Sequence, residues 1–362
     1  MLFYFTCVII VTANKKSITI AMATIYDVAR KAGVSPMTVS RVINGRRGVR
    51  PETREKVLRA IEETGYIPNS LARSFVLQKT KTVGLVIPDI TNPFFTTLAR
   101  GVEDTAAKSQ FGVIFCNTDE SHEKEVMYLE FLARKRVDGV ILAPASRKRH
   151  SLKLLLSRNV PVVLVDREIE GLENLDLDIV KGDSVYGAYM LTQHLIRLGH
   201  RRIGIIVGSR EISTAEDRVE GYRKALEEAG IPLDESLIRF SSYSEEGGYT
   251  ATKELLALEH RPTAIFGGNN FIAIGAILAI RELGLRVPED VALVCFEDID
   301  FLSKVYPFLT VVTQPAYSMG VIATELLIRR IENRDKIRER REVVLKPELI
   351  IRESAGEKLV RG

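Results

Sequence analysis

The chain has 362 residues, of which 46% are hydrophobic, and this length favours two or three globular domains over one. Its net charge is only +4, but residues 22–82 hold 12 Lys and Arg against 5 Asp and Glu, a net +7. A basic head on a mildly acidic body is expected of a protein that meets nucleic acid. The three cysteines lie far apart and match no metal or disulfide spacing, which favours free thiols in a reducing cytoplasm.

Residues 1–21 form an apolar leader. Its apolar run, residues 2–11, is too short to span a bilayer, which takes about 20 apolar residues. It also lacks the positive start of a signal peptide, because Lys15 and Lys16 follow the run. We therefore expect no membrane association. We interpret Met22 as the native start and the leader as translated upstream sequence.

The segment 22–67 predicts three short helices. Thr24 begins the first with a capping-box pattern, and Gly33 ends it. Ser35 can cap the second helix, and Pro51 begins the third. Two short helices joined by a three-residue turn that contains glycine are the helix-turn-helix pattern.

In that pattern the second helix presents its N-terminal residues to base edges in the major groove. Arg41 can donate two hydrogen bonds to guanine, Pro36 and Met37 can contact a thymine methyl, and Thr38 lies on the same outward side. Phosphate contacts suit four further polar residues, namely Thr24, Ser35, Ser40 and Asn44. The alternative is a three-helix interaction domain with an incidental arginine. Capping, turn and charge agree with one another and favour DNA binding.

The stretch "TIYDVARKAGVSPMTVSRVINGRRGVRPETREKVLRAIEETGYIPNSLARS" resembles the DNA-binding headpiece of the lactose/galactose-repressor family of bacterial transcription regulators. The resemblance continues through "KTKTVGLVIPDITNPFF" to near Arg352, so it covers nearly everything after Met22. It implies a homodimer on palindromic double-stranded operator DNA and a body that binds a small effector.

Residues 68–82 resemble the hinge of that family, a coil that folds into a short helix only on operator DNA. The resemblance implies that Phe75, where the family has leucine, wedges into the central base step of the minor groove. Packing of Phe75 on the body is the alternative. Arg50 stands where the family often has a Ser or Asn cap, which weakens the cap but leaves a group for a phosphate. The expected DNA contacts therefore extend to Arg50, Asn69, Ala72, Arg73 and Phe75.

From Val83 the pattern changes to short apolar runs that alternate with amphipathic helices, one of which is expected at Val219–Ala229, directly after Arg218. The runs are "TVGLVIPDI", "FGVIFCNT", "VDGVILAPA", "VPVVLVDRE", "RIGIIVGS", "TAIFGGNN" and "VALVCFEDI". Such alternation is typical of parallel sheets covered on both faces, and seven runs favour two doubly wound α/β subdomains. By resemblance this body has the fold of periplasmic sugar-binding proteins.

We expect the body to span residues 83–352, followed by a tail at 353–362. Subdomain one is expected at about 83–183 and 313–340, and subdomain two at about 184–312 and 341–352. The chain would then cross between them near Asp183, Thr313 and Arg340, and three crossings form a hinge that a ligand can close.

Ligands of such folds bind beyond the carboxyl ends of the strands. By resemblance to sugar-binding proteins, Phe94 and Phe95 would flank a sugar ring, and its hydroxyls would contact Asn92, Asp166, Arg167, Arg218, Asn269 and Glu297. Each residue has another explanation, such as a turn, a cap or the core, but together they favour a pocket. The set resembles the ribose-type pattern, with Glu297 where the family usually has Asp.

Two other function classes compete with a ligand-controlled repressor. A sugar-binding transport protein would have a cleavable signal peptide and no basic head. An enzyme would need a catalytic or phosphate-binding motif, and the sequence has no "GxSxG", "GxxxxGK[ST]" or "GxGxxG" after a strand. We therefore expect a non-enzymatic cytoplasmic regulator without cofactor or metal. It would be a dimer, because no leucine-heptad helix of the kind that builds tetramers follows Arg352.

Overall fold

The computed structural model describes residues 23–43, 48–66, 80–171, 175, 177–299, 305–333 and 339–356. The predicted leader and five of the predicted DNA contacts, Asn44, Asn69, Ala72, Arg73 and Phe75, lie outside the described residues. The chain divides into two compact units, residues 1–78 and 79–362.

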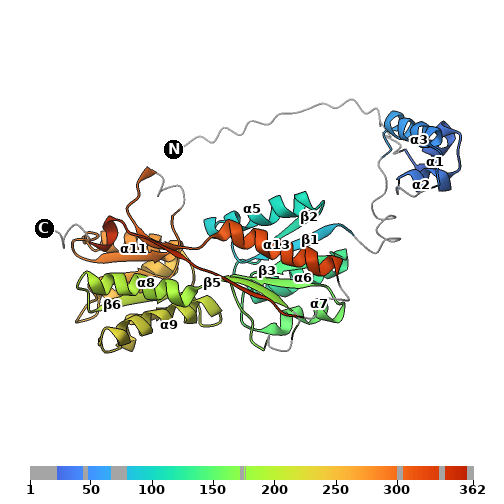
Figure 1. Cartoon of the computed structure of the whole chain (residues 1–362). Coiled ribbons are helices and arrows are strands. Elements are labelled where there is room, and N and C mark those ends of the chain that lie inside the picture. The colour runs from blue at the N-terminus through green and yellow to red at the C-terminus, as the bar shows by residue number, and fades with distance from the viewer. Residues whose placement is uncertain are drawn as a thin grey trace, which may run out of the picture. The chain divides into compact units, whose positions relative to one another are not determined.

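The first unit contains the headpiece helices α1 (Ile25–Ala32), α2 (Pro36–Ile43) and α3 (Pro51–Thr64) (Figure 1). The Thr24 backbone N–H and hydroxyl both donate to the Asp27 carboxylate, at 2.9 and 2.6 Å, which confirms the predicted capping interaction. Gly33 ends α1 with a left-handed φ of 66°. A small core that includes Val28, Val39 and Val57 joins the three helices.

The second unit begins with a six-stranded sheet whose order is β11-β5-β4-β3-β1-β2. All its neighbouring strands are parallel. The strands are β1 (Thr82–Ile87), β2 (Gly112–Asn117), β3 (Gly139–Leu142), β4 (Val162–Val165), β5 (Asp178–Gly182) and β11 (Glu342–Leu345). The helices that cover it are α5 (Pro93–Lys108) and α13 (Ala316–Glu332) on one face, and α6 (His122–Lys135) and α7 (Lys153–Ser157) on the other.

A second six-stranded sheet has the order β12-β10-β9-β8-β6-β7, and its neighbours are parallel except for antiparallel β12. The strands are β6 (Ile203–Val207), β7 (Ile238–Phe240), β8 (Ala264–Gly267), β9 (Ala292–Phe296), β10 (Thr310–Thr313) and β12 (Glu348–Ile350). The covering helices are α8 (Ser184–Arg197) and α9 (Ser213–Glu228) on one face, and α10 (Glu245–Leu256) and α11 (Asn270–Glu282) on the other.

Strand periodicity explains why each sheet has two buried faces. Val83, Leu85 and Ile87 of β1 pack under α5 and α13, whereas Val86 packs under α6. Every residue of β3, β4, β6 and β9 is buried, as expected for parallel strands covered on both sides. The predicted fold class, a helical headpiece followed by two doubly wound sheets, is confirmed.

The chain crosses between the sheets after Gly182, after Thr313 and after Leu345. The sequence placed the third crossing near Arg340 and assigned residues 341–352 to subdomain two, and this was wrong for β11. That strand pairs in parallel with β5 and so belongs to the first sheet. The two strands after residue 340 are similar in sequence character, and only the pairing partners decide which sheet each one joins.

Helices α5 and α13 pack at unusually close range because each has a glycine at the contact (Figure 1). A Cβ added at Gly101 of α5 would lie 2.2 Å from the Tyr317 carbonyl oxygen, and one at Gly320 of α13 would lie 2.1 Å from the Leu98 carbonyl oxygen.

Among the described residues, none of the helices combines the length and the apolar character that a membrane span requires.

The close contact between α5 and α13 predicts that Gly320→Ala destabilises the body. Alanine favours a helix over glycine by about 1 kcal/mol, but the overpacked contact costs about 1–3 kcal/mol and forces α5 from α13. The matched control is Gly112→Ala, whose added Cβ would approach nothing closer than 4.0 Å. Urea unfolding followed by circular dichroism should show a lower midpoint for Gly320→Ala alone; equal midpoints for both variants would contradict the close contact.

Candidate functional site

One cavity lies where the carboxyl ends of the two sheets face each other. It is lined by Asp89, Asn92, Phe94, Phe95, Glu120, Asp166, Arg167, Thr214, Arg218, Tyr243, Asn269, Phe271, Glu297 and Gln314. All eight residues predicted to contact an effector are in this set. They come from both subdomains, and the parallel direction of the strands brings their loops together.

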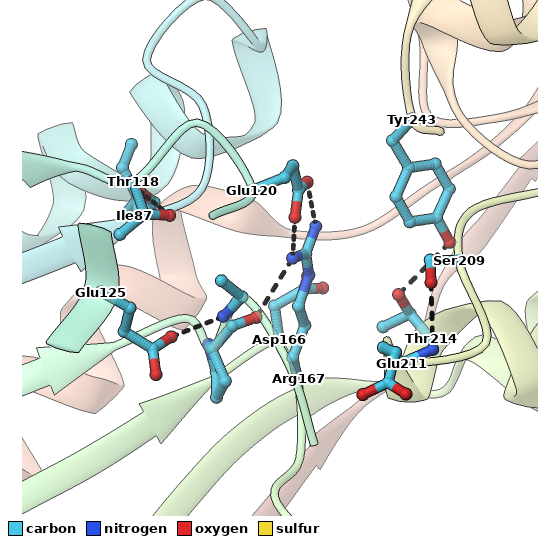
Figure 2. A network of polar contacts seen from close by, with 12 residues as sticks. Ile87, Thr118, Glu120, Glu125, Asp166, Arg167, Ser209, Glu211, Thr214 and Tyr243 are labelled. Atoms are coloured by element: carbon cyan, nitrogen blue, oxygen red, sulfur yellow. Dashed lines mark hydrogen bonds and ion pairs between the residues drawn. The ribbon is translucent and has the colours of Figure 1, made fainter. Parts of the chain in front are cut away.

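Arg167 follows β4 and is held by the first subdomain. Its Nη1 and Nη2 donate to the two oxygens of Glu120 at 2.6 and 2.7 Å, and Nη1 also donates to the Pro144 carbonyl oxygen at 3.1 Å (Figure 2). Only 3% of Arg167 is exposed. A bidentate Arg–carboxylate pair sets the plane of the guanidinium, so this side chain enters the cavity in a defined orientation.

Arg218 is the corresponding cation of the second subdomain. Its Nη1 donates to the Gly268 carbonyl oxygen at 2.6 Å and to the Tyr243 hydroxyl at 3.0 Å, and its guanidinium lies 4.0 Å from the centre of the Phe296 ring. The sequence placed Arg218 just before a helix, but α9 begins at Ser213, so the residue lies inside the helix.

Asp166 and Glu297 occupy equivalent places in the two subdomains. Each follows the fourth strand of its subdomain, and each has a left-handed backbone, with φ of 66° and 73°. The Asp166 N–H donates to the Val180 carbonyl oxygen at 2.9 Å, and the Glu297 N–H to that of Val312 at 2.7 Å. Such a conformation costs a non-glycine residue of the order of 1–3 kcal/mol and is concentrated at functional sites.

Both carboxyl groups are shifted toward the neutral form. Burial raises the pKa of Glu297 to about 8, against the opposing effects of the Gln314 amide and the Arg218 guanidinium. Burial also raises the pKa of Asp166, although Arg167 and Arg218 oppose the shift. The Gln314 Nε2 donates to a Glu297 oxygen at 2.9 Å. A protonated Glu297 can therefore donate a hydrogen bond into the cavity at neutral pH.

Several buried polar atoms of the cavity have no hydrogen-bond partner within the described ranges. These atoms are Arg167 Nε, Arg218 Nε and Gln314 Oε1. The Asn92 and Asn269 side-chain oxygens cap α5 and α11 at 3.0 and 2.8 Å, and this use leaves their amide N–H groups for the cavity. Buried polar atoms are normally paired, so this concentration suits a ligand with several hydroxyl groups.

Hydrogen bonds join the two subdomains beside the cavity. The Asn270 Nδ2 donates to the Asn92 side-chain oxygen at 3.2 Å, and the Glu168 N–H donates to the Ser213 hydroxyl at 2.8 Å. The Arg147 N–H donates to the Glu211 carbonyl oxygen at 2.8 Å. The structure therefore shows the cleft in a closed arrangement.

The lining residues outside the predicted set are Asp89, Glu120, Thr214, Tyr243, Phe271 and Gln314. Glu120 follows β2, so the rule of strand carboxyl ends could have found it. Tyr243 follows β7, a three-residue strand that is too short to recognise from its pattern. Gln314 lies on the second crossing between subdomains, where the sequence shows no ligand signal. Thr214 lies in the first turn of α9, ahead of the stretch predicted to be helical.

The headpiece presents α2 as its candidate DNA-reading element. Val39 and Val42 face the core, while Met37 is 67% exposed and Arg41 is exposed. The Arg41 side chain has no hydrogen bond or ion pair in the part of the chain that the structure describes. The Ser35 hydroxyl accepts the Thr38 N–H at 3.2 Å and caps α2 as predicted. Arg50 precedes α3 and makes no side-chain cap, which agrees with the predicted weakness there.

No group of three or more His, Cys, Asp or Glu side chains in the described ranges could hold a metal ion. Cys116 and Cys295 are both buried free thiols.

Comparison with known proteins identifies the family. Residues 80–351 match the model of periplasmic binding proteins and the sugar binding domain of the LacI family, and residues 24–69 match that of bacterial regulatory proteins of the lacI family. The HTH-type transcriptional repressor PurR of Pasteurella multocida is 39% identical over 339 residues, which cover 93% of this chain and 100% of that protein.

The ribose operon repressor of Haemophilus influenzae is 38% identical over 333 residues, which cover 92% of this chain and 98% of that protein. The crystal structure of the Lac repressor dimer bound to operator and an anti-inducer has a TM-score of 0.78 at 26% identity, with 92% of this chain and 99% of that chain covered. A transport protein is not favoured, because the matches include the DNA-binding headpiece. The chain belongs to the LacI family of bacterial regulatory proteins and is a ligand-controlled, DNA-binding transcription regulator.

Proposed function

We propose that this regulator is a homodimeric cytoplasmic repressor whose affinity for palindromic operator DNA is controlled by an uncharged sugar in the body cavity. The observation that carries the proposal is the lining of one closed cavity by side chains from both sheets, with buried polar atoms left unpaired. The names of the relatives support the class of ligand, since one of them is a ribose operon repressor.

The charges of the cavity favour a neutral ligand over a sugar phosphate. Its two guanidinium groups, on Arg167 and Arg218, are balanced by the carboxyl groups of Asp89 and Glu120, while burial raises the pKa of the other two carboxyls, those of Asp166 and Glu297. Phe94 and Phe95 offer apolar faces, with their ring centres 5.0 Å apart at an interplanar angle of 77°. Aromatic faces against C–H groups and polar atoms against hydroxyls are the division of contacts that a small polyol requires.

The ligand would act through the angle between the subdomains. A sugar that contacts Asp166 and Arg167 on one side and Arg218, Asn269 and Glu297 on the other binds the closed cleft better than an open one. It can shift the equilibrium only by that difference in affinity. The shift would change how the two first subdomains of a dimer face each other, and with it the placement of the hinge segments on DNA.

On DNA, we propose that Arg41, Met37 and Pro36 read bases, with Thr38 on the same face. Thr24, Ser35, Ser40, Asn44 and Arg50 would contact phosphates, which supply most of the affinity. By the family resemblance, Asn69, Ala72, Arg73 and Phe75 would act in the minor groove. We propose no enzymatic activity and no cofactor.

The effector proposal is tested by a thermal-shift screen of the full chain against neutral pentoses and hexoses, their phosphates, nucleosides and purines. We expect a neutral sugar to raise the melting temperature and its phosphate to leave it unchanged. Arg218→Ala should abolish the shift, and Arg223→Ala, whose exposed ion pair with Glu235 lies outside the cavity, should keep it. A response confined to phosphates or purines would refute the sugar proposal. Each hit is then tested for its effect on DNA affinity at a stated salt concentration.

The headpiece proposal predicts the effect of Arg41→Ala. The lost bidentate contact should relax selectivity at one base pair of each half-site by about 1–3 kcal/mol. Competition binding with operator variants measures the change, and Arg59→Ala, on the exposed side of α3 and paired with Glu55, serves as the control. Unchanged operator preference in the Arg41 variant would contradict base reading by this residue.

The Glu297 carboxyl predicts a pH dependence of stability. The pKa of this carboxyl is raised from 4.5 to about 8 in the folded protein. The contribution of Glu297 to the free energy of unfolding is therefore fully present below pH 4.5 and is lost as the pH rises toward 8. We expect the melting temperature of the wild type to fall more steeply from pH 5 to 8 than that of Glu297→Gln, which stays neutral. Parallel curves for the two proteins would show that this carboxyl is not protonated in the closed cavity.

A further inference from the structure

Glu125 is a fully buried acidic residue outside the effector cavity. It lies on α6, in the first subdomain, with 0% of its surface exposed, and it is not among the lining residues. Burying a carboxyl group is costly unless a specific interaction compensates for the lost hydration. The buried Glu125 carboxyl therefore needs a specific polar partner, which an apolar core does not provide.

The carboxyl is linked to Arg167 through a single peptide group. Glu125 Oε2 accepts the N–H of Ala145 at 2.6 Å, and the carbonyl oxygen of Pro144 accepts Arg167 Nη1 at 3.1 Å. The Ala145 N–H and the Pro144 carbonyl belong to the same peptide bond. In Figure 2, where Glu125 and Arg167 are labelled, dashed lines mark these two hydrogen bonds. Hydrogen bonds arranged in such a chain polarise and strengthen one another.

The Pro144 carbonyl helps to set the orientation of the Arg167 guanidinium. Glu120 contacts both terminal nitrogens of the guanidinium, and Pro144 supplies a further acceptor to Nη1. Together these acceptors set the direction of Nε, which has no hydrogen-bond partner among the described residues and lies 3.7 Å from an Asp166 oxygen. A displaced Pro144 carbonyl would leave Glu120 alone to hold the side chain.

The peptide also begins the segment that bridges the cleft. Two residues further on, the Arg147 N–H donates to the Glu211 carbonyl oxygen at 2.8 Å, and Lys148 Nζ lies 3.2 Å from a Glu211 carboxylate oxygen. Glu125 thus anchors a turn that contacts Arg167 on one side and the second subdomain on the other.

We propose that Glu125 is a positioning residue of the effector site: its carboxyl fixes the Pro144–Ala145 peptide, whose carbonyl orients the Arg167 guanidinium. The consequence for ligand binding rests on the proposed function, but the chain of contacts does not. Burial raises the pKa of the Glu125 carboxyl, and Oε2 can accept the Ala145 N–H whether or not the other oxygen carries a proton. Glutamine, whose side-chain oxygen can also accept the Ala145 N–H, should therefore be able to take the place of Glu125.

The test compares Glu125→Gln, which keeps the acceptor, with Glu125→Leu, which removes it at similar volume. In full-length protein labelled with ¹⁵N-arginine, the Arg167 Nε–H signal is assigned by its loss in Arg167→Lys. The internal control is Arg330, a buried arginine of the same subdomain whose Nε and Nη2 donate to Asp178 at 2.6 and 2.7 Å. We expect Glu125→Leu to shift or broaden the Arg167 signal and to leave that of Arg330 in place, and Glu125→Gln to preserve both.

An unchanged Arg167 signal in Glu125→Leu, or equal changes in the Gln and Leu variants, would overturn the proposal. If Glu125→Leu does not fold, the Ala145 amide signal decides, observed in ¹⁵N-alanine-labelled wild type and Arg167→Met. Loss of the donor to Pro144 should shift that amide if the peptide transmits the contact, and an unshifted amide refutes the chain. No ligand enters either measurement, so a failure here is distinguishable from a failure of the sugar proposal.

Discussion

The parallel direction of the strands in both sheets is the constraint on which the rest of the body depends. Each strand of a parallel sheet ends at the same edge, so the loops after β1, β2, β4, β8 and β9 converge at one cleft. Three chain crossings, after Gly182, Thr313 and Leu345, join the two sheets. On the proposed mechanism, a ligand held by both edges would change the angle between the sheets.

The interior of the cleft is held by compensated charges rather than by apolar packing. Arg167 is paired with Glu120, whereas Arg218 relies on a carbonyl, a tyrosine hydroxyl and the face of Phe296. Asp166 and Glu297 both line the cavity, and both have a strained left-handed backbone. Strain, burial and unpaired donors cost stability in the absence of a partner molecule, and this cost makes the site responsive to one. Behind Arg167, the Glu125 carboxyl accepts the N–H of the peptide whose carbonyl oxygen accepts Arg167 Nη1.

Some departures from the sequence-based expectations have a physical cause. Tyr243 and Gln314 were missed because a three-residue strand and a crossing segment have too little periodicity to recognise. Arg218 was predicted to contact the ligand but was placed before its helix, because the first turns of α9 lack a side-chain cap at their start. β11 was assigned to the wrong sheet because strands 342–345 and 348–350 differ in pairing partners and not in composition.

The sequence by itself determined the three headpiece helices, the alternation of strands and helices, the two-subdomain plan and eight of the cavity residues. These features depend on local periodicity, caps, turn residues and the rule that ligands bind at strand ends. Only the tertiary structure decided which acceptor each buried arginine meets, that Asp166 and Glu297 share a left-handed backbone, and that one peptide connects Glu125 to Arg167. Such contacts join residues 20 to 50 positions apart, and their partners depend on packing, which no local pattern encodes.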